Sequence, residues 1–121
     1  MTYIPDLTPC TYHRKPTENI AIGWLDIQHL FPTGDTSQEF KDKLKVLVDT
    51  RSVNRYMGWY SCQWCPHIHP LAAGNGSIVV ESPITKIVYE APVLIYHYVT
   101  EHSYFPPLDF ITAVLYTPTM E

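Results

Sequence analysis

The amino-acid sequence predicts an α+β fold, in which a small antiparallel sheet packs with two or three helices and one zinc site staples the chain. Residues 18–26 and 77–90 contain the alternating and β-branched runs that are typical of strands. Residues 36–49 instead carry apolar side chains at helical spacing. Two closely spaced cysteines and two later histidines make up the ligand set of a small zinc site: Cys62, Cys65, His97 and His102.

Composition predicts one globular domain over residues 1–121, with an irregular N-terminal arm over 1–17 and a frayed tail over 117–121. A chain of 121 residues is long enough for one substantial core but not for two. Its 45% hydrophobic and 17% charged residues are typical of globular rather than disordered chains. The eleven prolines predict long ordered loops rather than a helical bundle.

Charge and hydropathy exclude several partners. The net charge of −4 leaves no basic footprint for nucleic acid, and no apolar run reaches the roughly 18 residues of a membrane span. The first residues lack the basic and apolar regions of a signal peptide, so we expect a cytoplasmic protein. A reducing cytoplasm favours metal-bound thiolates over a disulfide. The remaining candidate partner is another protein, and the oligomeric state is not specified by these features. Cys10 is expected to be a small, partly buried residue.

The first expected strand covers residues 18–26, where Ile20, Ile22 and Trp24 alternate with other residues. A turn is expected over residues 31–35. The clearest helix follows, because Thr36 and Glu39 have the spacing of a capping box. Its apolar stripe consists of Phe40, Leu44, Leu47 and Val48.

Two further strands are expected over residues 77–82 and 84–90, separated by Pro83. A break of one residue is too short for a simple hairpin, so the two runs could pair or could form one bent strand. A helix is expected from Ala91-Pro92 onward, because proline is favoured at the first helical position. Its sides are almost entirely apolar, which predicts a buried helix, and a third helix is expected over residues 109–116.

The spacing of the two histidines makes a geometric demand. On a regular helix five residues turn through about 500°, which would point the rings of His97 and His102 about 140° apart. A shared ion therefore requires the helix to tighten or end near Glu101. His67 and His69 are rival ligands, since they follow Cys65 directly. The cysteine pair also has two metal-free interpretations, a redox dithiol or two unrelated buried thiols.

Four short motifs are spread along the chain: Gly23-Trp24-Leu25-Asp26, Cys62-x-x-Cys65, Tyr89-Glu90-Ala91-Pro92-x-Leu94-Ile95-x-His97-Tyr98 and His102-x-Tyr104-x-Pro106-Pro107-x-x-Phe110. Together they resemble a family of small uncharacterised bacterial proteins. The resemblance implies a stand-alone bacterial domain and supplies no activity.

Three functions fit the cysteine and histidine pattern. A ligand set closed by two thiolates and two imidazoles favours a structural zinc in a non-enzymatic interaction or regulatory module. Surplus aromatic residues, among them Trp64 and Tyr104, would supply its contact surface. A zinc-dependent hydrolase is the alternative, with Glu101 as the general base, although the sequence lacks His-Glu-x-x-His. A thiol–disulfide protein using Cys62 and Cys65 is the third.

Overall fold

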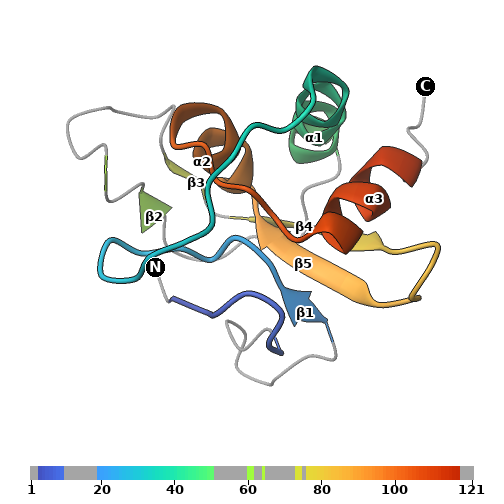
Figure 1. Ribbon diagram of the computed structural model, residues 1–121, viewed down its shortest axis with the longest axis horizontal. Coiled ribbons are helices and arrows are strands. Elements are labelled where there is room, and N and C mark those ends of the chain that lie inside the picture. Colours follow the sequence, from blue (N-terminus) through green and yellow to red (C-terminus); the bar gives the residue numbers. More distant parts are fainter. Residues whose placement is uncertain are drawn as a thin grey trace.

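The computed structural model describes residues 3–9, 19–50, 60–61, 64, 73–74 and 76–117. Three helices gather on one side of a three-stranded sheet, and the N-terminal segment lies on the other side (Figure 1). In chain order the elements are β1 (Ile20–Ala21), α1 (Gln38–Thr50), β2 (Tyr60–Ser61), β3 (Ala73–Gly74), β4 (Ser77–Glu81), β5 (Val88–Pro92), α2 (Ile95–Glu101) and α3 (Leu108–Tyr116). The α+β class predicted from the sequence is therefore confirmed.

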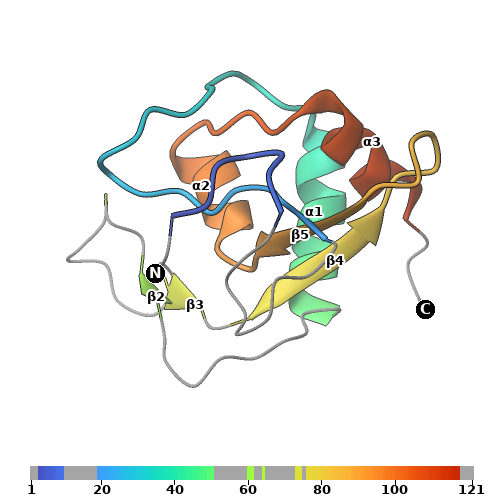
Figure 2. The same cartoon turned by 90° about the horizontal axis from the view of Figure 1, so that it is seen from below.

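The sheet is mixed, with the strand order β1-β5-β4. Strand β4 runs antiparallel to β5, with Ser77 opposite Pro92, whereas β1 runs parallel to β5, with Ile20 opposite Tyr89. The prediction of an antiparallel sheet is correct for β4 and β5 but wrong for β1. A parallel neighbour requires a long crossover, and the chain between β1 and β5 provides one. Strands β2 and β3 form a separate antiparallel pair (Figure 2).

The connection between β4 and β5 shows that the two runs pair as a hairpin. Its turn is longer than the one-residue break expected at Pro83, because the Ser82 hydroxyl accepts hydrogen bonds from the backbone amides of Ile84 and Thr85. Strand β5 consequently begins only at Val88. It then continues through Ala91 and Pro92, where a helix start was expected, and α2 begins later, at Ile95.

Strand β1 is much shorter than the strand predicted over residues 18–26, because the backbone turns at Gly23. This glycine has a φ of 79°, a conformation that side chains rarely adopt. A Cβ at this position would lie 3.0 Å from the Ile95 Cδ1 atom, so α2 packs directly against the bare backbone. The turn places the Trp24 ring out of solvent, where its Nε1 donates to the Glu90 carbonyl at 3.1 Å.

Helix α1 begins at Gln38, and its capping residue is one position later than the predicted Thr36. The N-cap residue is Ser37, whose hydroxyl accepts a hydrogen bond from the Phe40 backbone amide at 3.1 Å. The capping box predicted between Thr36 and Glu39 is wrong, and the Thr36 hydroxyl has no hydrogen-bond partner within the described ranges. The predicted apolar stripe is confirmed, since its first three members are fully excluded from solvent and the fourth packs against them: Phe40, Leu44, Leu47 and Val48.

A polar cluster ties the hairpin turn to the start of α3. The Asp109 carboxylate accepts hydrogen bonds from Ser82 at 2.8 Å, Thr85 at 2.7 Å and Tyr89 at 2.6 Å. Its place in the first turn of α3 also suits the positive end of the helix dipole. Burial, followed by the hydrogen bond to Asp109, raises the pKa of Tyr89 to about 12. The hydroxyl of Tyr89 therefore stays protonated and donates throughout the neutral range.

We expect Gly23→Ala to lower the free energy of unfolding by about 1–2 kcal/mol or more. The left-handed backbone alone costs about that much for a residue with a Cβ, and the added methyl group would press on Ile95. Urea denaturation monitored by circular dichroism would measure the change. Lys86→Gly is the matched control, because Lys86 already has a φ of 65° and is exposed. A Gly23→Ala variant as stable as the wild type would contradict the role assigned to this turn.

A second prediction concerns acid stability. Hydrogen bonds from Tyr89 and then Thr85 lower the pKa of Asp109 below its ordinary value of 3.8. A carboxyl group whose pKa is lowered by folding stabilises the fold at pH values above its pKa in the unfolded state. This contribution disappears as the pH falls through its pKa in the folded state. Asp109→Asn should therefore remove part of the stability loss seen below about pH 4. Urea denaturation at a series of pH values would test this, with the exposed Asp35→Asn as control; equal acid profiles for wild type and Asp109→Asn would refute it.

Candidate metal centre

Helix α2 ends at Glu101, as the predicted sharing of one ion by His97 and His102 requires. His102 is the C-cap residue, with a φ of −123° and a ψ of 9°, and its amide still donates to the Tyr98 carbonyl. Because His102 has left the helical conformation, its ring does not continue the helical rotation. The ring centroids of His97 and His102 lie 5.0 Å apart, with 72° between the ring planes. Both histidines are half-buried.

Trp64 connects this histidine pair with the cysteine motif, because it stands between Cys62 and Cys65 in the sequence. Its ring lies 5.5 Å from that of His102 and meets the ring of Tyr98 edge-on at 5.9 Å. A third contact joins Trp64 to Phe31, whose rings meet edge-on at 5.4 Å. These contacts place the residue in the middle of the cysteine motif directly beside the C-terminal end of α2.

The two ends of the cysteine-containing segment are joined by backbone pairing. Strand β2 precedes Cys62 directly, and Tyr60 pairs with Gly74 while Ser61 pairs with Ala73. The chain therefore leaves β2 and re-enters β3 at two neighbouring strands.

Electrostatics at the histidine pair favour a neutral ring at His97. Burial, followed by the charge of His102, lowers the pKa of His97, and the neighbouring charge of Glu101 opposes both effects. A neutral imidazole has a nitrogen lone pair to offer, whereas a protonated one has none. Glu101 itself, the base proposed for a hydrolase, is exposed at the end of α2.

The structure brings together half of the predicted ligand set. His97 and His102 are neighbours, whereas Cys62 and Cys65, like the rival ligands His67 and His69, lie outside the described residues. Among the residues that are described, no three histidine, cysteine or acidic side chains gather closely enough to hold a metal ion.

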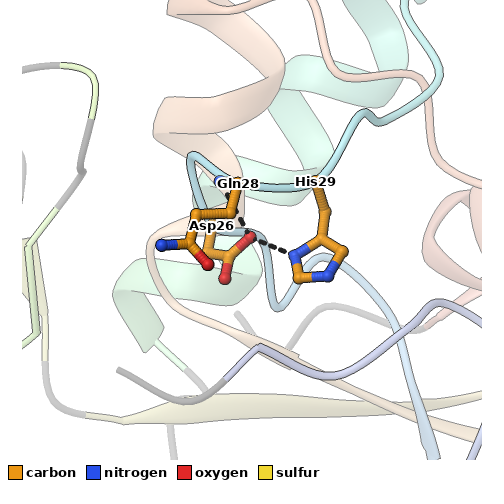
Figure 3. Close-up of polar contacts among 3 residues, drawn as sticks. All are labelled: Asp26, Gln28 and His29. Atoms are coloured by element: carbon orange, nitrogen blue, oxygen red, sulfur yellow. Dashed lines mark hydrogen bonds and ion pairs between the residues drawn. The ribbon is translucent and has the colours of Figure 1, made fainter.

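A polar cluster around Asp26 was not predicted from the sequence. The Asp26 carboxylate accepts a hydrogen bond from the Gln28 backbone amide at 3.2 Å and contacts the His29 Nδ1 atom at 2.6 Å (Figure 3). The ring of His29 stacks on Tyr3 at 3.8 Å, with only 2° between the planes. The Asp26-x-Gln28-His29 spacing is that of a common side-chain turn, which the sequence could have signalled. The contact with Tyr3 has no sequence signal, because the two residues belong to separate segments.

Comparison with known protein families assigns the chain to one of them. A family described as "Domain of unknown function (DUF7919)" matches residues 2–115. The chain belongs to this family. Its match over nearly the whole sequence fits the resemblance to uncharacterised proteins noted from the motifs. No curated protein and no solved structure matches the chain. Across the described residues, none of the helices combines the length and the apolar character needed to cross a membrane.

Proposed function

We propose that Cys62, Cys65, His97 and His102 bind one Zn²⁺ and that this site is structural, in a bacterial interaction or regulatory module. The distance between the two histidine rings carries the proposal. Imidazoles that share one tetrahedral zinc through Zn–N bonds of about 2.0–2.1 Å have ring centroids about 5 Å apart. The observed distance between the centroids of His97 and His102 is 5.0 Å.

Chain connectivity supports the choice of the two cysteines. The ring of Trp64 contacts His102, and Cys65 follows Trp64 directly while Cys62 precedes it by two residues. Because consecutive Cα atoms are only about 3.8 Å apart, both cysteines must lie close to Trp64. Thiolate sulfurs bind zinc at about 2.3 Å, and a Cys-x-x-Cys spacing lets both reach one ion from a single turn. The same reasoning keeps His67 and His69 as the rival ligands, because they follow Cys65 closely.

The proposed site would join two parts of the fold that otherwise touch through aromatic rings. One part is the segment between β2 and β3, and the other is the C-terminal end of α2. Four protein ligands leave no position for a substrate or water, so such a zinc stabilises rather than catalyses. Its stabilisation would fix the half-buried rings of Trp64 and Phe31, which pack over the buried ring of Tyr104. Tyr104 itself is excluded from solvent, so the contact surface expected from the sequence does not include it. Rigid aromatic side chains are favoured at protein–protein contacts.

Elemental analysis of purified protein should find one zinc per chain. A strong chelator should lower the melting temperature by about 10 °C or more, because structural zinc contributes on the order of 10 kcal/mol in small domains. His97→Gln, His102→Gln, Cys62→Ser and Cys65→Ser should each lose the metal. His29→Gln should keep it, because His29 is exposed and bonded to Asp26 instead.

Cobalt substitution would distinguish the ligand sets. Tetrahedral coordination by two sulfurs and two nitrogens gives a Co²⁺ protein with intense visible absorption and a thiolate charge-transfer band. Loss of that spectrum in His67→Gln or His69→Gln, with retention in His97→Gln, would reassign the imidazole ligands. Metal-free protein whose fold is unaffected by the chelator would refute the zinc proposal, and reversible oxidation of the two cysteines would then be the property to measure.

A further inference from the structure

A small cavity lies between the N-terminal segment and the loop that follows β1. Its volume is about 150 Å³, and its lining combines one carboxylate with aromatic and aliphatic side chains: Tyr3, Asp6, Leu25, Leu30, Phe31 and Pro32. A cavity of roughly this volume can hold a benzene molecule, so the space suits a group of about six non-hydrogen atoms. Apolar walls with one placed polar group are typical of small ligand sites.

Asp6 is the charged group of this cavity. Its Oδ1 atom accepts from the Gly23 amide at 2.9 Å, and its Oδ2 atom accepts from the Tyr104 hydroxyl at 2.6 Å. A carboxylate can accept about four hydrogen bonds, so its capacity is only partly used by these two. Among the described residues, the contacts between basic and acidic side chains are His29–Asp26 and Lys45–Asp49, so Asp6 has no cationic partner there. Burial raises the pKa of Asp6, and the two hydrogen bonds oppose that effect.

The aromatic walls are held in place by contacts outside the cavity. Tyr3 stacks on the ring of His29. The Asp26 carboxylate holds that ring through the His29 Nδ1 atom (Figure 3). Phe31 lies edge-on to Tyr104 at 5.9 Å and is also held by Trp64. The two rings are therefore positioned before any ligand arrives, which lowers the entropy cost of binding.

We propose that this cavity binds an alkylammonium or guanidinium group, as found in free amines and in lysine and arginine side chains. Such a cation would compensate the carboxylate of Asp6, which is half-buried and has no charged partner among the described residues. The faces of Tyr3 and Phe31 attract cations, and the aliphatic side chains suit an alkyl stem. The net charge of −4 favours cationic ligands over anionic ones.

Leu30 marks the outer rim of the cavity, because it lines the space and yet is 101% exposed. A ligand that reaches Asp6 past this side chain would cover apolar surface that water now contacts. A side chain projecting from a larger molecule would cover more of it than a free amine, so comparison of the two sources is informative.

Titration followed by two-dimensional ¹H–¹⁵N NMR of the full chain would test the proposal. The probes are n-butylammonium chloride, the capped peptides Gly-Lys-Gly and Gly-Arg-Gly, and capped Gly-norleucine-Gly as the neutral control. Saturable shifts at the amides of Tyr3, Asp6 and Phe31 are expected with the cationic probes only. Tighter binding of the peptides would identify a protein side chain as the ligand, and tighter binding of the amine would identify a small molecule.

Asp6→Asn should weaken cation binding about tenfold or more, because a hydrogen bond between charged groups is lost while the side-chain shape is kept. Asp35→Asn removes an equal charge from an exposed site and should leave binding unchanged. Leu30→Lys provides an independent test that does not disturb the core, since it places a competing cation at the rim; Leu30→Gln is its neutral control. Absence of saturable shifts, equal binding of the norleucine peptide, or full binding by Leu30→Lys would each overturn the proposal.

Discussion

Glu90 lies at the centre of the middle strand β5, and its side chain is fully excluded from solvent. Its carboxylate accepts from Asn19 at 3.1 Å and from Ser77 at 2.7 Å, while its carbonyl accepts from the Trp24 ring nitrogen. Burying a carboxylate is costly unless such partners are in place. The start of β1, the start of β4 and the turn after Gly23 must therefore assemble around one residue. This requirement explains why a two-residue strand such as β1 has a defined register.

The parts of the fold that could be predicted are those whose cause is local. The stripe of α1 repeats at helical spacing within one segment, so its burial followed from the sequence alone. The direction of β1 did not, because alternation in residues 18–26 shows that one face is buried but not which strand lies beside it. The stop at Gly23 also needed the structure, since the cause is the approach of Ile95 from a helix far along the chain.

The same distinction applies to the site. The end of α2 near Glu101 was predicted from the short spacing between His97 and His102 alone, and the helix ends there. The contact between Trp64 and His102 joins two distant segments, and no spacing rule predicts it. The cavity beside Asp6 was missed as well, because it lies between two segments that no spacing rule brings together. The Tyr104 hydroxyl that donates to Asp6 is 98 positions away from it in the sequence.

That separation also sets the order in which the chain can fold during synthesis. Strand β1 can pair early with the N-terminal segment, but it cannot join the sheet until Tyr89 has been made. The Asp6–Tyr104 hydrogen bond needs most of the remaining chain as well. Until then the Trp24 ring and the side chains of β1 have no sheet to cover them. Folds that depend on such distant pairings form slowly, and their exposed apolar segments are open to association with other chains. The N-terminal part of this protein is therefore made first but can join the sheet only after most of the chain has been synthesised.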